Sequence, residues 1–338
     1  MRAFVISEPG VAQVLESPPP RLVDGEIVVT PLLVGICGTD LELVDGTLDP
    51  QYVRYPLVLG HEWVGRLEHD VAGVGPVGTR VVVEGVVPCD ACAECARGAT
   101  NLCTNYDELG FTRAGALAEH VSVPERLVHA LADDVALDDA VFVEPMAVVW
   151  RALTRLPLRH ELRVAIIGDG TIALLAAHLV RLFEPTRTII FGQRDEQRDL
   201  ARRAGADDFV VAPPSELFDL VIEASGSQSG VATALSHGAR GAMVILLGLT
   251  PHGTTVDLVP DRVVNNDVII QGSFSYTREA FRNVVRRVNA GELRPSFLIT
   301  HRFTLENSTR AIVALRVGVT NEPRGKVVID ITDDDLKG

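Results

Sequence analysis

The sequence predicts an α/β protein with two domains, one made of short strands and one built around a doubly wound parallel sheet. Three observations support this prediction. The chain has 338 residues, a length typical of two domains. Near residue 147 its pattern changes from short strands with glycine- and proline-rich turns to strands that alternate with helices. A buried strand at 163–167 leads directly into a glycine-rich turn and an apolar helix.

Residues 1–146 have the pattern of an all-β domain. The run Glu26–Thr30 is strand-like, and turn-forming stretches such as Pro18-Pro19-Pro20 and 71–79 separate runs of this kind. The sequence Gly-Ile-Cys-Gly-Thr-Asp at positions 35–40 follows the strand at 26–30. Cys37 therefore lies just after a predicted strand.

Residues 147–285 alternate between strands and helices. The turn Gly168–Ala173 has the pattern GxGxxA and joins the strand at 163–167 to an apolar helix at 174–183. Small residues at such a turn let a pyrophosphate approach backbone N–H groups at a helix N-terminus. Further strands are expected at 188–192, 219–225, 242–248 and 268–274. The predicted dinucleotide-binding residues are Gly168, Gly170, Thr171, Ile172, Gln193, Arg194, Arg198, Ser225, Gly248 and Ser273.

Four of the five cysteines fall in one short run, spaced CxxCxxC and followed by a fourth after seven residues. Short loops of this kind bring several thiolates to a common centre about 2.3 Å away, which suits one tetrahedral metal ion. A set of four thiolates leaves no open coordination position. The run therefore predicts a structural zinc site formed by Cys89, Cys92, Cys95 and Cys103.

The fifth cysteine, Cys37, is followed about two dozen residues later by Gly60-His61-Glu62. Cysteine, histidine and carboxylate are the mixed ligands that leave zinc open to water or substrate. A lone buried cysteine is also common in packing, and a Gly-His-Glu tripeptide often forms a turn. The residues alone leave both interpretations open.

The predicted strand 188–192 bears on cofactor preference. An enzyme specific for NAD places Asp or Glu at the end of this strand, whereas NADP requires a cation there instead. Gly192 stands at the acidic position, and Arg194 and Arg198 follow it. This arrangement favours NADP, with NAD as the alternative because Asp195 and Glu196 could pair with the arginines. Asp169 must point away from the pyrophosphate.

Taken together, these motifs resemble the medium-chain zinc-dependent alcohol dehydrogenase family over nearly the whole chain. The matching segments are 35–40, Gly60-His61-Glu62, the four-cysteine run, 115–120, Glu144-Pro145, the glycine-rich turn and 299–303. The resemblance implies a GroES-like all-β catalytic domain at 1–146, to which 286–338 returns, and a Rossmann NAD(P)-binding domain at 147–285. Two zinc ions per chain are implied.

The resemblance also implies roles for individual residues. Cys37 and His61 carry over as ligands of a catalytic zinc, and either Glu62 or Glu144 completes the set. The implied chemistry is Lewis-acid catalysis of hydride transfer to the nicotinamide. Thr39 matches a hydroxyl that relays the alcohol proton. Glu42 stands where some relatives have a histidine, so it could accept that proton or bind a hydroxyl of the substrate.

The ligand set and the Glu-Pro motif make the chain similar to the polyol, sugar, cyclitol and threonine dehydrogenases of this family. Polar residues on segments that flank the substrate in relatives suit a substrate with several hydroxyls; they are Glu42, Tyr52, Arg54, Asp107 and Glu108. We therefore expect a polyol, sugar or (amino)cyclitol. The alternatives are an L-threonine 3-dehydrogenase, a family member that binds NADPH without turnover, and a zinc-ribbon interaction module.

The composition excludes several classes of partner. The net charge of −14 disfavours nucleic acid and anionic membranes. No apolar run reaches the roughly 18 residues of a membrane helix, and the N-terminus lacks a signal-peptide pattern. Zinc thiolates favour a reducing compartment, so the cytoplasm is expected. The resemblance implies a homo-oligomer, either a dimer or a tetramer.

Overall fold

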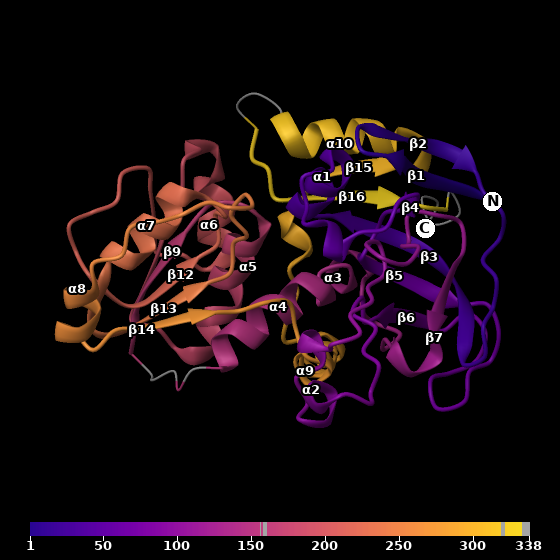
Figure 1. Ribbon diagram of the computed structural model, residues 1–338, viewed down its shortest axis with the longest axis horizontal. Helices are drawn as coiled ribbons and strands as arrows, with labels where there is room; N and C mark the ends of the chain where they lie inside the picture. The colour runs from indigo at the N-terminus through magenta and orange to yellow at the C-terminus, as the bar shows by residue number, and fades with distance from the viewer. Residues whose placement is uncertain (156, 158–160, 319–321, 333–338) are drawn as a thin grey trace. The chain divides into compact units, whose positions relative to one another are not determined.

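The computed structural model describes residues 1–155, 157, 161–318 and 322–332, and the chain forms two compact units (Figure 1). The first unit contains the described residues of Met1–Ala147, Tyr276–Val319 and Lys326–Gly338. The second contains those of Val148–Ser275 and Thr320–Gly325. The chain thus passes between the units within helix α4 (Val143–Thr154), at Tyr276, and again before Lys326.

The first unit is built on two sheets. Its larger sheet has the order β15-β16-β3-β5-β6-β8, with β7 also paired to β3, and its smaller sheet has the order β2-β1-β4. The strands of the larger sheet are β3 (Glu26–Ile36), β5 (Glu62–Leu67), β6 (Arg80–Val83), β7 (Val121–Pro124), β8 (Val128–Ala130), β15 (Ile299–Thr304) and β16 (Lys326–Asp330). Those of the smaller sheet are β1 (Arg2–Glu8), β2 (Val11–Glu16) and β4 (Leu57–Val58).

Strand β3 is the centre of this unit. Most of its residues are buried, and it pairs antiparallel with β16, β5 and β7. Its alternate apolar side chains enter a core shared with neighbouring strands. The helices of the unit are α1 (Gly38–Asp45), α2 (Ala93–Ala96), α3 (Leu137–Ala140), α9 (Arg278–Asn289) and α10 (Ser308–Val317).

The second unit contains one parallel sheet with the strand order β11-β10-β9-β12-β13-β14. Strands β9, β10 and β12 have near-continuous apolar runs, as expected where helices cover a sheet on both faces. The strands are β9 (Arg163–Ile167), β10 (Arg187–Phe191), β11 (Asp208–Val210), β12 (Phe218–Glu223), β13 (Gly238–Leu246) and β14 (Ile269–Gly272). The helices are α5 (Thr171–Val180), α6 (Arg198–Ala204), α7 (Gln228–Ser236) and α8 (Pro260–Asn265). The predicted fold class is confirmed.

Two details differ from the sequence-based boundaries. The chain returns to the first unit at Tyr276 instead of residue 286, because Tyr276 and α9 pack there. The helix predicted at 174–183 begins at Thr171, directly after Gly170, and ends in a short 3-10 turn at Arg181–Phe183. Among the described residues, no helix has the length and apolar character needed to cross a membrane.

Candidate active site and metal centres

Three of the predicted metal ligands converge at the end of β3. Cys37 follows β3 directly, Glu62 is the first residue of β5, and His61 precedes it. The two strands are antiparallel neighbours in which Gly35 pairs with Glu62. The Cys37 sulfur, a His61 nitrogen and a Glu62 oxygen consequently all lie within 4.8 Å of one another. This cluster fits one zinc ion held by mixed ligands, with a coordination position left open.

Asp40 contacts two of these ligands, one through a hydrogen bond and the other through its charge. Its Oδ2 accepts a hydrogen bond from the Cys37 N–H at 2.8 Å, and its Oδ1 lies 3.5 Å from His61 Nδ1. Burial opposes protonation of His61, but the Asp40 carboxylate raises the pKa of His61 well above its usual value. A carboxylate behind a metal-binding histidine fixes the orientation of the ring. Asp40 belongs to the Gly-Thr-Asp motif, and this role was not assigned from the sequence.

Lys326 is a further residue of the site that sequence reasoning missed. Its ammonium group forms an ion pair with the Glu62 carboxylate, and both residues are 1% exposed. Strands β16 and β5 flank β3, so the two side chains meet over Gly35. A Cβ at position 35 would lie 2.7 Å from both Glu62 Oε2 and Lys326 Cε. Gly35 therefore provides the space for this ion pair.

Two more buried carboxyl groups belong to this region. Glu144, in the first turn of α4, lies outside the group of three ligands that share the 4.8 Å distance. Burial raises the pKa of Glu144 to about 8 against the opposing charge of His61, and the charges of Glu62 and Glu108 add to the rise. Burial likewise raises the pKa of Glu108 to about 7. Without a bound metal, both groups can therefore exist as neutral acids near pH 7, able to donate and accept hydrogen bonds, whereas a bound dication would favour their ionised forms.

The predicted proton-relay residues lie on α1. The Thr39 hydroxyl is 3.7 Å from the Cys37 sulfur, and Glu42 follows one helical turn later. Residues three apart lie on the same face of a helix. Burial raises the pKa of Glu42. The structure thus keeps Thr39 beside the candidate zinc ligand, and the relay roles of Thr39 and Glu42 stay predictions.

The four remaining cysteines form a second cluster. The sulfurs of Cys89, Cys92, Cys95 and Cys103 lie within 4.8 Å of one another. Backbone N–H groups donate to two of them, from Cys89 to the Cys103 sulfur at 3.3 Å and from Cys95 to the Cys92 sulfur at 3.5 Å. The Cys95 N–H lowers the pKa of Cys92 to about 5, whereas burial raises the pKa of Cys95 to about 12. A bound dication would keep all four as thiolates, so the set fits a closed structural zinc site.

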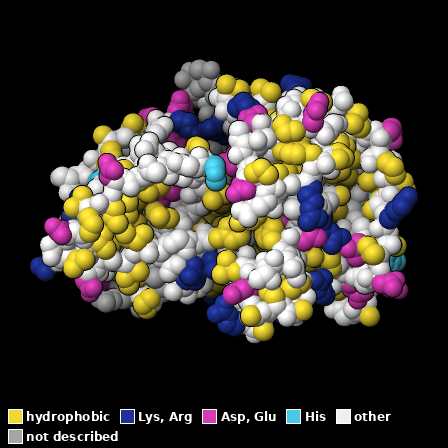
Figure 2. Space-filling view, viewed as in Figure 1, with side chains coloured by type: hydrophobic (Ala, Val, Ile, Leu, Met, Phe, Trp, Pro, Cys, Tyr) yellow, Lys and Arg dark blue, Asp and Glu magenta, His cyan; other side chains and the backbone are white. Residues whose placement is uncertain are grey.

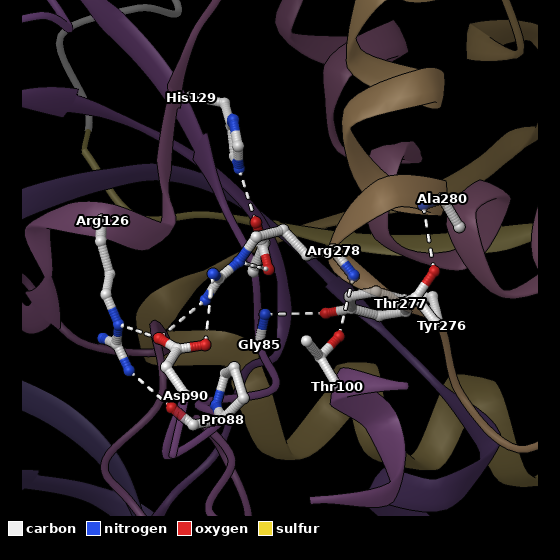
Figure 3. Close-up of polar contacts among 11 residues, drawn as sticks. Gly85, Pro88, Asp90, Thr100, Arg126, His129, Tyr276, Thr277, Arg278 and Ala280 are labelled. Atoms are coloured by element: carbon white, nitrogen blue, oxygen red, sulfur yellow. Dashed lines mark hydrogen bonds and ion pairs between the residues drawn. The ribbon is translucent and has the colours of Figure 1, made fainter. Parts of the chain in front are cut away.

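A hydrogen-bonded network anchors this cysteine loop to α9 (Figure 3). Asp90, between the first two cysteines, accepts a hydrogen bond from Arg126 Nε at 2.8 Å and forms an ion pair with Arg278. The Arg278 N–H donates to the Thr100 hydroxyl at 3.0 Å. Beside them, the Gly85 N–H donates to the buried Tyr276 hydroxyl at 2.7 Å. The loop is therefore tied to the rest of the first unit by side chains other than its cysteines.

The predicted dinucleotide-binding residues lie along the carboxyl edge of the parallel sheet. Gly168 follows β9 with φ of 115°, and a Cβ there would lie 2.9 Å from the Ser225 nitrogen. Gly170 is the N-cap of α5. Such a turn leaves a helix N-terminus accessible to a pyrophosphate. The same edge carries Thr171, Ile172, Gln193, Ser225, Gly248 and Ser273.

Several of these side chains are already engaged. Ser225 donates to Glu223 at 2.5 Å, and Ser273 accepts from Arg151 at 3.0 Å. Arg198 donates to the Phe209 carbonyl and to Asp195, both at 2.6 Å. Arg194 is ion-paired with Asp169. The cofactor contacts proposed for all of them stay predictions.

Comparison with protein families gives two matches that together cover most of the chain. Residues 23–133 match the alcohol dehydrogenase GroES-like domain. Residues 137–318 match the glucose dehydrogenase C-terminus.

The curated relatives are dehydrogenases. L-threonine 3-dehydrogenase from Streptomyces coelicolor is 31% identical over 345 residues, a span that includes 96% of this chain and 97% of that protein. D-arabinitol dehydrogenase 1 from Uromyces fabae is 24% identical over 330 residues, with coverage of 92% and 93%.

Solved structures show the same architecture. A proposed zinc-binding dehydrogenase from Sinorhizobium meliloti 1021, bound to NADP, superposes with a TM-score of 0.89 at 26% identity, over 98% of this chain and 99% of that one. A short chain alcohol dehydrogenase from E. coli CFT073, complexed with NADH, also gives 0.89, at 25% identity and the same coverage. The two structures hold different nicotinamide cofactors.

Proposed function

From the premise that the chain belongs to the medium-chain zinc-dependent alcohol dehydrogenase family, we propose that it transfers a hydride between a polyhydroxy substrate and NADP. The substrate is a polyol, sugar or (amino)cyclitol, and a secondary alcohol of it is the reacting group. Membership of this family makes the protein an oxidoreductase that acts on small alcohols or ketones. The substrate class and the preference for NADP over NAD are the parts proposed.

The observation that carries the proposal is the surplus of buried carboxyl groups around the candidate zinc ligands. Glu62, Glu108 and Glu144 are all at least nine-tenths buried. The described part of this cluster contains one lysine, Lys326, and its ammonium group is already paired with the Glu62 carboxylate. Glu108 and Glu144 can form hydrogen bonds with neutral hydroxyl groups of a substrate. A substrate that carried a carboxylate would instead need a cation in the site.

Different side chains of the site have the separate roles that alcohol oxidation requires: metal binding, ligand orientation and proton transfer. Cys37, His61 and either Glu62 or Glu144 would hold a zinc ion, which would supply a Lewis acid to polarise the substrate oxygen. Asp40 orients His61. Thr39 would pass the hydroxyl proton outward to Glu42, and a bound nicotinamide would accept the carbon-bound hydrogen as hydride. The proton and the hydride together account for the two hydrogens that the alcohol loses.

L-threonine is the second candidate substrate, because relatives that match the whole chain carry the name L-threonine 3-dehydrogenase. Its ammonium group would suit Glu108, but its carboxylate would need a cation. Arg113, a nearby arginine, is ion-paired with Glu26 and Asp107, which leaves Arg54, on a segment expected to flank the substrate, as the candidate cation. A non-catalytic NADPH-binding role is disfavoured, since Cys37, His61 and Glu62 would have no reason to converge.

The test is nicotinamide absorbance with the zinc-loaded protein on polyols, aldoses, cyclitols, aminocyclitols, L-threonine and simple secondary alcohols, with NADP and NAD in turn. Turnover of a polyhydroxy compound with NADP is the expected result. Turnover of L-threonine alone would overturn the proposed substrate class. Absence of turnover in both directions, with cofactor shown to bind, would favour the non-catalytic role.

Replacement of Glu108 tests directly whether the buried carboxyl groups near the candidate zinc ligands bind substrate hydroxyls. In Glu108→Met the side-chain volume is kept but the hydrogen bonds are lost, so kcat/KM for the polyhydroxy substrate should fall about 10- to 100-fold. The value for a simple secondary alcohol should stay within about threefold, since that substrate has no second hydroxyl. Glu119→Met, which removes a half-buried ion-pair partner of Arg2, is the matched control. Equal losses on both substrates would contradict a role in substrate recognition.

We also propose that copies of the chain pair through the edge strand β14, in the reducing environment of the cytoplasm that suits zinc thiolates. β14 is the last strand of its sheet, and large apolar side chains are exposed on and near it, namely Leu258, Val259, Val264, Ile269 and Ile270. Hydrophobic side chains gather on the surface of this unit in Figure 2. Exposed sheet edges of this kind are templates for pairing. Light scattering should give a dimer or tetramer, and a monomer would refute the pairing.

A further inference from the structure

Glu223 is a buried carboxyl group at the edge of the parallel sheet where the dinucleotide is expected. It is the last residue of β12 and is 0% exposed. Two glycines make room for it. A Cβ on Gly230 would lie 2.9 Å from Glu223 Oε1, and a Cβ on Gly248 would lie 2.6 Å from Glu223 Oε2. The fold therefore encloses this carboxyl group between α7 and the segment that follows β13.

Glu223 joins the turns that follow β12 and β13. Its Oε1 accepts hydrogen bonds from the Ser225 N–H at 2.8 Å, the Ser225 hydroxyl at 2.5 Å and the Gly226 N–H at 3.1 Å. Charge-assisted hydrogen bonds of this kind are typical of an ionised carboxylate. The Glu223 carbonyl accepts from the N–H groups of Leu247 at 2.9 Å and Gly248 at 3.2 Å. Both turns carry predicted cofactor-binding residues, Ser225 in one and Gly248 in the other.

The second oxygen of this carboxyl group has no partner. Glu223 Oε2 is buried and takes part in no hydrogen bond, and no cationic side chain among the described residues forms an ion pair with Glu223. A buried carboxylate without a cation is costly. A positive charge on a ligand bound nearby would offset that cost.

The strand order indicates which half of a dinucleotide would lie near Glu223. Strand β9 leads into the glycine-rich turn, with β10 beside it on one side and β12, then β13, on the other. The pyrophosphate is expected at that turn, and the adenosine ribose is expected at the end of β10. The nicotinamide half would therefore lie on the side of β12 and β13, where Glu223 joins the two turns.

We propose that the Glu223 carboxylate favours binding of the oxidised nicotinamide, whose ring carries a positive charge, over the uncharged reduced form. Because the carboxyl group is enclosed, it acts through its charge and does not touch the ring. Stabilising the cation makes the bound reduced cofactor a stronger hydride donor. This inference rests on the proposed function only for the presence of a nicotinamide cofactor, and it requires neither the substrate class nor the choice of NADP.

The test compares the binding of oxidised and reduced cofactor to the wild type and to Glu223→Gln, without substrate. NADPH binding is followed by nicotinamide fluorescence and NADP⁺ binding by calorimetry, and NADH and NAD⁺ are measured in the same way. Glutamine keeps the shape of the side chain and the Oε1 acceptor but removes the charge. The Kd of the oxidised form relative to that of the reduced form should rise about tenfold, as expected for unit charges roughly 10 Å apart at an effective dielectric constant of about 20.

A purely structural role would give a different result. If Glu223 only held the two turns, its replacement would weaken both forms equally, and an unchanged ratio would therefore overturn the inference. Buried charges are screened much less by salt than exposed ones, so the change in the ratio should persist at high ionic strength. Adenosine 5′-monophosphate, which lacks the nicotinamide half, should bind to Glu223→Gln as it does to the wild type.

Two companion variants serve as controls. Glu223→Asp keeps the charge on a shorter side chain, so both affinities should fall while their ratio stays within about threefold of the wild-type value; a tenfold change in this ratio would contradict the inference. Asp219→Asn removes a solvent-accessible carboxylate of the same strand, one that is paired with Arg163, and should leave both affinities unchanged.

Thermal melting completes the test. Glu223→Gln should melt within a few degrees of the wild type, because it removes a buried charge that has no partner. A variant that does not fold would show that Glu223 is required for the structure, which would also overturn the inference. An unchanged ratio together with turnover of a polyol would overturn this inference alone, whereas a changed ratio without turnover of any substrate would refute the proposed reaction alone.

Discussion

Replacement of Lys326 by methionine should cost more stability than almost any other loss of a single charge in the first unit. Methionine keeps most of the aliphatic volume of the lysine, so packing around β16 is retained. The change removes the ammonium group and leaves the Glu62 carboxylate without its ion-pair partner. Both residues are 1% exposed, so water cannot replace the lost charge.

The size of the effect follows from this burial. Removing one partner of a buried ion pair costs about 3–5 kcal/mol, whereas an exposed pair contributes about 0.2–1 kcal/mol. The exposed comparison in the same unit is Arg316, which donates to both oxygens of Asp45. We therefore expect Lys326→Met to destabilise the metal-free protein by about 3–5 kcal/mol and Arg316→Met by less than about 1 kcal/mol. Bound zinc should reduce the first loss, because it adds positive charge beside Glu62.

The assay is urea unfolding of the first unit, followed by the fluorescence of Trp63. The chain has two tryptophans, so a Trp150→Phe background makes the buried Trp63, next to Glu62 on β5, the sole reporter. The double variant Glu62→Gln, Lys326→Met should recover most of the lost stability, since no unpaired charge remains. A loss in Lys326→Met as small as that in Arg316→Met, or no recovery in the double variant, would refute the reasoning.

Two further predictions concern the metals and pH. Metal analysis of the wild type should give two zinc ions per chain. Cys37→Ala should retain one zinc ion and lose activity, whereas Cys103→Ala should retain one zinc ion and lose stability. Full activity of Cys37→Ala with any substrate would contradict the assignment of Cys37 as a catalytic zinc ligand. Burial, with Arg181 adding to it, lowers the pKa of His178 to about 4. As pH falls, His178 takes up a proton in the unfolded chain before it does so in the folded protein. The free energy of unfolding should therefore decrease between pH 6.5 and about pH 4. At about 1.4 kcal/mol per pKa unit, the decrease is about 3 kcal/mol. In a Trp63→Phe background, where Trp150 alone reports on unfolding of the second unit, His178→Gln should lack this component. An unchanged pH dependence would show that His178 does not cause it.

The sequence predicted the fold class and the family correctly because its signals are local. The turn Gly168–Ala173 and its flanking strand and helix are contiguous, and so is the four-cysteine run. Boundaries were less accurate. The return to the first unit at Tyr276 depends on contacts of Tyr276 with Gly85 and of α9 with Ala130, residues that precede them by well over a hundred positions. No local pattern encodes such a contact.

Roles that depend on partners could not be predicted in the same way. Glu144 appeared in a Glu-Pro motif as a possible zinc ligand, yet the structure leaves it outside the group of three ligands with a pKa of about 8. From the sequence, the Asp169 carboxylate was expected to point away from the pyrophosphate of the cofactor. In the structure it forms an ion pair with Arg194. In both cases the sequence identified the residue, but its charge partners lie on other elements.

By itself, the sequence determined which residues are available for chemistry and which local elements carry them: the cysteine spacing, Cys37 after a strand, His61 beside Glu62, and the glycine-rich turn. The tertiary structure alone decided which of them meet. The register of β3 between β5 and β16 brings Glu62 to Lys326 across 264 positions of sequence, over a glycine that leaves room for both. Charge interactions act over a few ångströms in space regardless of separation along the chain, so pairing and pKa depend on the fold.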